Sequence, residues 1–343
     1  MSAGLAELLA AVARTRVCIV GDVLLDVFTR VHAGRVCPDA PALIVREHDV
    51  TYRASGAALA AQALRSLGVD VQLITVLGGD DAGRRVARLI RRDGTSLKAV
   101  TVDRPTPSKN RIIAGHPGGA RAAGQVLLRL DREDATDVTS PVEAVLIGTA
   151  REAIGRSNAV LLSDYTKGVC TPALTQAVIE ASRAVGIPVI VDPKHPDATR
   201  YAGATVLTPN LAELAAMTGR RTETSEVRDL ARRLRTVADV EWVLATRDAE
   251  GLTAVGPDGA QFDVPAFPDD VIDVAGAGDV FAGALAAALA CALMRRAAVV
   301  GSLAAGLSLR HEAHKQVTPE ELLKAADRHA VTSWFLDMEV QGA

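Results

Sequence analysis

Short apolar runs alternate with amphipathic stretches along most of this chain. Val17-Cys18-Ile19-Val20 is an uninterrupted apolar run that ends at Gly21-Asp22, which predicts a strand buried on both faces. The same alternation predicts further strands over 71–76, 159–162, 189–191, 204–207 and 242–246, and helices over 2–14, 57–67, 82–92, 171–185, 211–217 and 225–237. Strands and helices in this order form a parallel sheet with helices on both faces, so we expect a doubly wound α/β fold.

Two segments break the alternation. Residues 41–54 and 97–131 contain strand-like pieces, and the stretch 114–124 is rich in glycine, as is typical of a loop. We expect a small β-rich lid on the α/β body, with lid segments at about 36–55 and 97–131 in one domain that spans 1–343. The apolar run from Val280 to Met294 is too short to span a bilayer and is expected to form one buried helix.

Composition and charge narrow the class of protein. Hydrophobic residues make up 49% of the 343 residues and aromatic residues only 3%, so the core is expected to consist mainly of Ala, Val and Leu. A formal net charge of -3 gives no support to general nucleic-acid binding. The four cysteines form no Cys-x-x-Cys pair, and no Walker A sequence is present. Since no basic region precedes the first apolar residues, we expect a cytoplasmic protein without a membrane or nucleic-acid partner.

The stretch Asp273-Val274-Ala275-Gly276-Ala277-Gly278-Asp279 is the strongest candidate for chemistry. Small residues let backbone N–H groups approach a ligand, and a helix N-terminus suits an anion such as phosphate. A carboxylate in the first helical turn is able to take a proton from an incoming hydroxyl. An anion cradle beside a base is what phosphoryl transfer to an alcohol requires. The alternative is a glycine-rich turn in which the aspartate only caps the helix.

Polar residues follow several of the predicted strands. Asp22 and Asp26 follow the first strand, where they either accept hydrogen bonds from sugar hydroxyls or cap a turn. Lys194 follows a later strand and is a candidate for contact with a phosphate, or else a solvated lysine. Asn210 and Glu213 follow the next strand and either cap a helix or face a ligand, with Glu213 holding Mg²⁺ through water. Because ligands bind at the carboxyl ends of strands in doubly wound sheets, we expect these groups to converge.

These motifs resemble those of the ribokinase/PfkB family of carbohydrate kinases, and the resemblance covers roughly residues 15 to 330. The segment from Asp273 to Gly283 is similar to the carboxy-terminal signature of that family. Within the family, the chain is most similar to the branch that phosphorylates D-glycero-D-manno-heptose 7-phosphate at its anomeric hydroxyl. That likeness rests on the segments Gly21 to Asp26, Pro38 to Pro41, Leu162 to Gly168, Val191 to Lys194, Arg200 to Thr205 and Thr208 to Asn210. The resemblance implies a ribokinase-like three-layer α/β/α fold with a β lid.

The resemblance also implies roles in the nucleotide half of the site. Asp279 would be the catalytic base, and the backbone N–H groups of Gly276, Ala277 and Gly278 would form the anion hole for charge on the γ-phosphate. The positions that would contact ATP and its Mg²⁺ are Lys194, Asn210, Glu213, Thr246, Arg247, Gly251 and, near the adenine, Ser302. Many relatives also use K⁺, for which Asp273 and the backbone around 310–315 are the corresponding place.

The acceptor half is implied in the same way. Asp22, Asp26 and Asp164 would bind the sugar, and Gly56 would let it approach the backbone. A sugar that already carries a phosphate needs cationic partners. The cations available near the expected lid and cleft are Arg53, Lys109, Arg111, Arg129 and Lys167. Lids of this family close over the sugar and often make a dimer contact, so the resemblance implies a homodimer through the lid.

One departure from the family concerns the acceptor. Leu59 stands where the family usually has an asparagine that bonds a sugar hydroxyl, and an unpaired buried hydroxyl costs ~1–3 kcal/mol. The leading hypothesis is an ATP- and Mg²⁺-dependent kinase that converts the heptose 7-phosphate to the 1,7-bisphosphate. The alternatives are a PfkB-type kinase for fructose, a hexose phosphate or a nucleoside, and a catalytically silent homologue that binds sugar or nucleotide.

Overall fold

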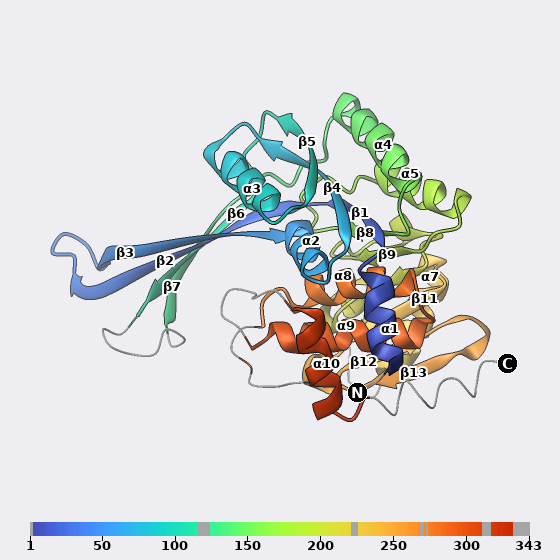
Figure 1. Cartoon of the computed structure of the whole chain (residues 1–343). Coiled ribbons are helices and arrows are strands. Elements are labelled where there is room, and N and C mark those ends of the chain that lie inside the picture. Colours follow the sequence, from blue (N-terminus) through green and yellow to red (C-terminus); the bar gives the residue numbers. More distant parts are fainter. Residues whose placement is uncertain are drawn as a thin grey trace.

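A mixed sheet of nine strands forms the centre of the structure (Figure 1). The computed structural model describes residues 3–115, 124–220, 226–267, 271, 274–310 and 317–331. In sheet order the strands are β13 (Gln261–Val264), β12 (Leu252–Val255), β11 (Trp242–Thr246), β10 (Val206–Leu207), β9 (Val189–Asp192), β8 (Ala159–Ser163), β1 (Arg16–Gly21), β4 (Asp70–Gly78) and β5 (Ser96–Val102). All neighbours from β11 to β5 are parallel, as the sequence predicts, whereas the unpredicted β12 and β13 form an antiparallel edge.

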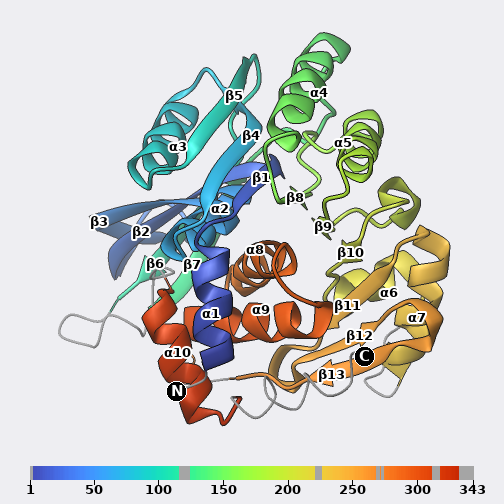
Figure 2. The same ribbon diagram turned by 45° about the vertical axis from the view of Figure 1, so that its right-hand side comes forward.

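Helices cover both faces of this sheet (Figure 2). One layer consists of α1 (Ala3–Val12), α2 (Ala57–Ser66), α3 (Asp81–Arg92), α8 (Ala277–Leu289), α9 (Met294–Ser308) and α10 (Pro319–Arg328). The other consists of α4 (Ser140–Ile154), α5 (Pro172–Ala184), α6 (Leu211–Thr218) and α7 (Val227–Ala238). Successive side chains of a strand point to opposite faces. In β1, Val17 and Ile19 therefore pack into the first layer and Cys18 and Val20 into the second.

A second sheet of four strands projects from the α/β body (Figure 1). Its order is β3 (Leu43–Gly56), β2 (Val23–Val36), β6 (Ser108–Ala114) and β7 (Gln125–Arg132), and we call it the lid sheet. β2 is antiparallel to β3 and parallel to β6, and β7 is antiparallel to β6. Residues 116–123 of the expected loop at 114–124 lie outside the described residues.

The lid sheet corrects the expected lid segments in two places. β2 already begins at Val23, although the expected segment starts only at about residue 36. Apolar residues recur at alternate positions of β2, as at Leu25, Val27 and Val31, and this period of two is the signal that marks the strand. β5 lies inside the expected segment 97–131, but it pairs with β4 in the main sheet.

The apolar run from Val280 to Met294 does not form one helix. α8 ends at Leu289 and α9 begins at Met294, and between them the side chain of Leu293 is 74% exposed. The two helices then pack closely, since a Cβ at Gly301 would lie 2.9 Å from the Phe281 ring. Among the described residues, no helix combines the length and the apolar character that crossing a membrane would require.

Candidate active site

The carboxyl ends of neighbouring strands bring most of the predicted site residues together. β1, β8, β9, β10 and β11 are consecutive and parallel in the main sheet, so the chain leaves each of them at the same edge. α8 packs against β8 and β9, which brings the first turn of α8 to that edge. The predicted convergence of groups from separate strand ends is therefore present, and Asp279 joins it from a helix.

Asp279 lies in the first turn of α8 and is buried, with 4% of its surface exposed. Gly276 precedes the helix with φ 81°, in the left-handed region that favours glycine. The first N–H groups of a helix have no partners within the helix, and the helix dipole makes this end positive. A Cβ added at Gly278 would meet only open space. The expected cradle of Gly276, Ala277 and Gly278 thus lies open beside the expected base.

The carboxylate of Asp279 carries one strong contact. The hydroxyl of Tyr165, which follows β8, donates to it, at 3.0 Å from Oδ1 and 2.9 Å from Oδ2. Burial raises the pKa of Asp279 to about 8, with a further contribution from the Asp192 carboxylate, while Lys194 and the Tyr165 hydrogen bond act in the opposite direction. A carboxylate with such a pKa is matched to accepting a proton near neutral pH.

Lys194 lies among three carboxylates at this edge. Its Nζ is 2.7 Å from Glu213 Oε1 and 3.3 Å from Asp192 Oδ1. Although burial by itself lowers the pKa of the Lys194 ammonium, the Asp192 and Glu213 carboxylates outweigh it and raise the pKa. Burial raises the pKa of Asp192 and of Glu213, so one ammonium offsets the charge of several acids. Asp279 is the third acid of this group, since its charge also acts on Lys194.

Asn210 and Glu213 form a capping box at the start of α6. The Asn210 side chain accepts a hydrogen bond from the Glu213 N–H, and Glu213 Oε2 accepts one from the Asn210 N–H at 2.8 Å. Thr246, at the end of β11, forms a β-bridge to Asn210, which places a third ATP candidate beside them. Glu213 caps the helix through Oε2 and also contacts Lys194 through Oε1, so capping does not prevent it from contacting other groups of the site.

The remaining ATP candidates lie apart from Lys194. Arg247 Nη1 pairs with Glu250 Oε2 at 3.2 Å, and its backbone N–H donates to the Gly251 carbonyl at 2.6 Å. Gly251 has φ 88°, and a Cβ there would lie 2.1 Å from the Val264 carbonyl oxygen, so this turn requires glycine. Ser302 is half-buried in α9, and its side chain makes no hydrogen bond among the residues that the structure describes.

Asp22, an expected sugar ligand, makes contacts within the protein. Its side chain is 1% exposed, and its carboxylate accepts three backbone hydrogen bonds from the loop after β8. Tyr165 N and Lys167 N donate to Oδ2 at 2.9 and 3.0 Å, and Val169 N donates to Oδ1 at 3.0 Å. Burial nevertheless raises the pKa of Asp22 to about 6. This acid holds the loop after β8 against β1, and its sugar contact stays a prediction.

Asp164 and Gly56 also serve the fold. Asp164 is buried and accepts hydrogen bonds from the Tyr201 hydroxyl at 2.7 Å and from the Thr166 N–H at 2.8 Å. Gly56 has φ 66°, and a Cβ there would lie 2.6 Å from the Asp22 carbonyl oxygen, so glycine is needed for chain packing. Both residues therefore have internal roles, and their expected sugar contacts stay predictions. Leu59, the departure from the family pattern, is buried in α2.

The lid sheet gathers the expected cations on one face. Asp26 of β2 is directly opposite Arg53 of β3 and Lys109 of β6. One step outward, Arg111 of β6 is opposite Arg129 of β7. Arg111 Nη1 lies 2.9 Å from Asp26 Oδ1, and Lys109 Nζ lies 5.6 Å from the centre of the Tyr165 ring. We call this the cationic lid face, and it adjoins the tyrosine that contacts Asp279.

Besides Arg111, two more of the expected cations have acidic partners. Arg129 Nη2 lies 2.5 Å from Asp131 Oδ2, and Lys167 Nζ lies 2.9 Å from Glu133 Oε1. Burial lowers the pKa of Lys109, although the nearby Asp26 carboxylate opposes this. A phosphate at this face would compete with the carboxylates for Arg129 and Lys167.

Tyr165 and Asp192 are the site residues that the sequence reasoning does not identify. Both lie at carboxyl ends of parallel strands, β8 and β9, as Lys194 does. The rule that identifies Lys194 would also have identified Tyr165 and Asp192 if it had been applied to every polar residue after a buried strand. Asp273 and the backbone at 311–315, the expected place for K⁺, lie outside the described residues.

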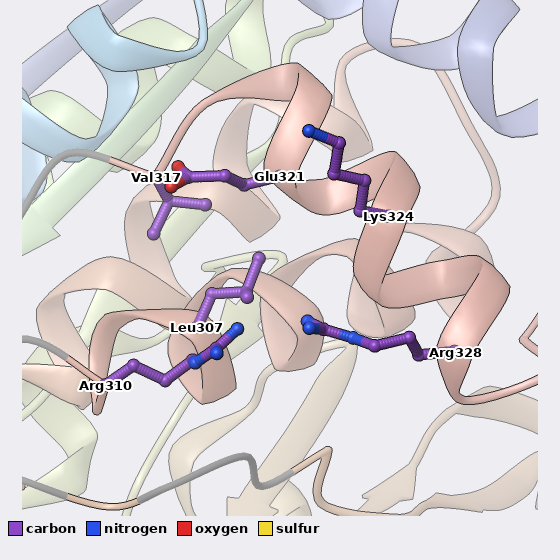
Figure 3. A pocket seen from close by; sticks show the side chains of 6 residues that line it. All are labelled: Leu307, Arg310, Val317, Glu321, Lys324 and Arg328. Atoms are coloured by element: carbon purple, nitrogen blue, oxygen red, sulfur yellow. The ribbon is translucent and has the colours of Figure 1, made fainter.

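A small hollow elsewhere in the fold contains none of the residues predicted to contact ATP or sugar. It measures about 70 Å³ and lies between α9 and α10 (Figure 3). Arg310 and Arg328 point toward each other across it, beside Leu307 and Val317. Among the described residues, no group of three or more His, Cys, Asp or Glu side chains is arranged to hold a metal ion.

Sequence comparison places these observations among known proteins. The sequence profile described as pfkB family carbohydrate kinase matches residues 14–320. The chain is 38% identical over 343 residues to the bifunctional protein HldE of Rhodospirillum rubrum, covering 99% of this chain and 67% of that protein. It is 36% identical over 310 residues to the HldE of Geobacter metallireducens, covering 89% of this chain and 61% of that one. The chain thus spans about three fifths to two thirds of the length of these relatives.

Solved structures with little sequence identity share the fold. The ribokinase of Arabidopsis thaliana complexed with ribose and ATP has a TM-score of 0.70 and 17% identity, over 91% of this chain and 98% of that one. The phosphofructokinase-2 of Escherichia coli in complex with potassium has a TM-score of 0.74 and 18% identity, over 93% and 99%. The expected ribokinase-like α/β fold is confirmed.

The structural role of Asp22 predicts how stability responds to its substitution. Asp22→Asn replaces an acceptor oxygen with an NH₂ group, which leaves at least one buried N–H of the 165–169 loop without an acceptor. We expect a loss of ~1–3 kcal/mol in the free energy of unfolding, measured by urea denaturation. The matched variant Asp26→Asn only breaks a partly exposed ion pair and should cost less than ~1 kcal/mol. Equal losses would contradict the assignment.

The raised pKa of Asp279 predicts a pH-dependent gain in stability on its substitution. The folded protein keeps this proton up to a pKa of about 8, whereas an unfolded aspartate loses it at about pH 4. The folded state binds more protons between these values, so stability falls as pH rises. Asp279→Asn should therefore be more stable than the unsubstituted protein at pH 8, and the difference should shrink toward pH 5. Thermal unfolding without ligands measures this, with exposed Asp103→Asn as control; a difference independent of pH would refute the argument.

Proposed function

Because the chain belongs to the pfkB family of carbohydrate kinases and is an ATP-dependent sugar kinase, we propose that its acceptor is a phosphorylated heptose. The reaction would convert D-glycero-D-manno-heptose 7-phosphate to the 1,7-bisphosphate. The observation that carries this proposal is the cationic lid face, which adjoins Tyr165 and, through it, the buried Asp279. An uncharged sugar would not need so many cationic side chains beside the base.

The chemistry that we assign to the site begins at Asp279. Its carboxylate would take the proton of the acceptor hydroxyl while the hydroxyl oxygen forms a bond to the γ-phosphorus. The bond between that phosphorus and the β–γ bridging oxygen breaks, and ADP leaves with the electron pair. The N–H groups at the start of α8 would stabilise the charge on the transferred group. Lys194 would contact the ATP phosphates, because it is the ammonium at this sheet edge.

The donor set at this edge fits the Mg²⁺ that ATP-using kinases employ. Asp192 Oδ2 is buried and has no hydrogen-bond partner among the described residues, although Oδ1 contacts Lys194. Mg²⁺ is usually bound by one or two carboxylates together with water and substrate phosphates. We assign Asp192 and Glu213 as the groups that would hold it, Glu213 through water. When bound, Mg²⁺ would neutralise negative charge on the ATP phosphates.

The phosphate of the acceptor would lie against the cationic lid face. Lys109 is the cation that brings the lid sheet to Tyr165, since its Nζ lies 5.6 Å from the ring centre. Arg53 lies opposite Asp26 on β3, and Arg111 forms an ion pair with Asp26. The ion pair with Arg111 uses Asp26 Oδ1. The other carboxylate oxygen of Asp26 would accept a hydrogen bond from a sugar hydroxyl. Arginine suits phosphate because its planar fork donates two parallel hydrogen bonds.

A kinase for another sugar is the second candidate, and Leu59 is the observation that favours it. Leu59 is buried in α2, where the family pattern has an amide that bonds a sugar hydroxyl. The resemblance to the heptose branch and the identity to proteins named HldE support the heptose. The acceptor panel described below separates the two candidates.

The outer face of the lid sheet supports the homodimer that we propose. Leu128 and Leu130 of β7 lie on the face opposite Arg129, and each is more than half exposed. Val36 and Leu43, where β2 and β3 are joined, are also exposed. Exposed apolar side chains gathered on one face are typical of a surface that another protein covers.

An acceptor panel tests the proposed reaction. With ATP and Mg²⁺, we expect ADP release to be stimulated by heptose 7-phosphate far more than by unphosphorylated heptose, fructose or a nucleoside. Asp279→Asn should keep ATP affinity and lose ~10²–10⁴-fold in kcat, because the base is removed. A coupled ADP assay and calorimetric titration of ATP measure the two. Stimulation by a plain hexose alone would overturn the heptose assignment, and no stimulation by any sugar would overturn the kinase site.

Substitution at the cationic lid face tests phosphate recognition. Arg111→Gln should raise KM for the phosphorylated acceptor by about 10–100-fold, the equivalent of one charge-assisted hydrogen bond. KM for ATP should not change, since Arg111 belongs to the lid and not to the strand ends. Lys98→Gln, an exposed lysine on β5, is the matched control and should leave both values unchanged. An equal rise in KM for an unphosphorylated acceptor would show that Arg111 acts only through Asp26.

A further inference from the structure

Tyr165 occupies a junction that the family comparison does not explain. Its hydroxyl donates to the carboxylate of Asp279, with 3.0 Å to Oδ1 and 2.9 Å to Oδ2. Its ring has the ammonium of Lys109 at 5.6 Å and that of Lys194 at 5.4 Å from the ring centre. Lys109 belongs to the lid sheet and Lys194 to the end of β9. One side chain therefore contacts the base and the cations of both halves of the site.

The backbone beneath Tyr165 is fixed before any ligand arrives. The buried carboxylate of Asp22 accepts the N–H groups of Tyr165 and Lys167. Between them, Thr166 has φ 54°, a conformation that costs a non-glycine residue energy and persists only when its surroundings hold it. Asp164 adds a hydrogen bond from the Thr166 N–H at 2.8 Å. A loop held in this way gives the phenol ring a defined position.

A carboxylate that serves as a base must offer one oxygen to its substrate. A phenol has one hydroxyl proton to donate, and an ionised carboxylate has about four lone-pair sites. Tyr165 therefore leaves room on Asp279 for the hydroxyl of an acceptor. Burial, together with the Asp279 charge, raises the pKa of Tyr165 well above its usual value, so the phenol keeps its proton.

We propose that Tyr165 is a positioning residue for the transfer step, whose hydroxyl holds one oxygen of Asp279 while the other oxygen receives the acceptor's proton. The proposal rests on the proposed kinase function. In the step, the acceptor O–H bond breaks and its proton passes to Asp279, the acceptor oxygen bonds to the γ-phosphorus, and ADP leaves. The phenol O–H bond stays intact throughout. A donor fixed on the carboxylate also favours its charged form, which is the form able to act as base.

The charges around Asp279 come from several elements. Asp192 at the end of β9 and Asp26 of β2 raise its pKa, and Lys194 after β9 lowers it, as does the Tyr165 hydrogen bond. All of these except the phenol remain when Tyr165 is replaced by phenylalanine. Removal of the hydroxyl should therefore raise the pKa of Asp279 above its present value of about 8.

Tyr165→Phe tests the proposal through kinetics. We expect kcat/KM for the acceptor at pH 7 to fall about tenfold, as the loss of one hydrogen bond to a charged group implies. KM for ATP should stay constant, and the acidic limb of the pH profile should move to higher pH. Unchanged pH dependence, with or without a lower rate, would overturn the proposal.

The matched control is Tyr201→Phe. The Tyr201 hydroxyl also donates to a buried aspartate, Asp164, at 2.7 Å, but it makes no hydrogen bond to Asp279 among the described residues. Its removal should lower stability and leave the acidic limb in place. An equal shift of the limb in both variants would mean that loosening of the loop, and not the phenol on Asp279, causes the effect.

A measurement without turnover separates this proposal from the proposed function. In protein labelled with ¹³C at aspartate Cγ, the signal that disappears in Asp279→Asn reports the titration of Asp279. Its pKa should be higher in Tyr165→Phe than in the unsubstituted protein. If no acceptor supports turnover but this shift is present, the proposed function fails and the coupling of Tyr165 to Asp279 stands. If turnover is normal and the shift is absent, the positioning role fails alone.

Discussion

The carboxylate of Asp22 is the contact on which the candidate site depends. It joins β1 to the loop after β8 through three backbone N–H groups, and these strands are neighbours at the centre of the main sheet. Those N–H groups are held in the interior, where an unpaired donor costs ~1–3 kcal/mol. The loop carries Tyr165, and Tyr165 contacts Asp279 on α8. The acid to which the sequence analysis assigns a sugar contact therefore also supports the geometry of the base.

The second constraint is the imbalance of buried charge. Asp192, Glu213 and Asp279 lie near a single ammonium, that of Lys194, and burial raises the pKa of each carboxyl group. A fold selected for stability alone would not gather acids in this way, because each desolvated charge without a full partner costs free energy. Such conflicts are expected where a site is prepared for a ligand. We assign the missing positive charge to the Mg²⁺ that Asp192 and Glu213 would hold.

The sequence predicts well those parts of the architecture that depend only on residues close together in the chain. The alternation of buried strands and helices identifies the parallel sheet, and the strand-end rule then identifies Lys194, Asn210 and Glu213 without knowledge of distances. The same rule cannot tell the direction of a side chain. Asp22 and the Tyr165 N–H that it accepts are 143 residues apart, so its inward orientation depends on a loop far along the chain. The lid bounds fail for the same reason, since β2 pairs with the distant β6 and β5 with β4.

The two faces of the lid sheet carry different kinds of side chain, cationic on one face and apolar on the other. Side chains of a strand point alternately to opposite faces, so a register slip of one residue would turn Lys109 and Arg111 outward and Leu130 toward the base. The irregularities of pairing lie farther out, between Arg30 and Val31 and between Ile112 and Ile113. The rows that contain Asp26, Lys109 and Arg111 are regular. Pairing is thus regular where the cations adjoin Tyr165, and the sheet bends only beyond them.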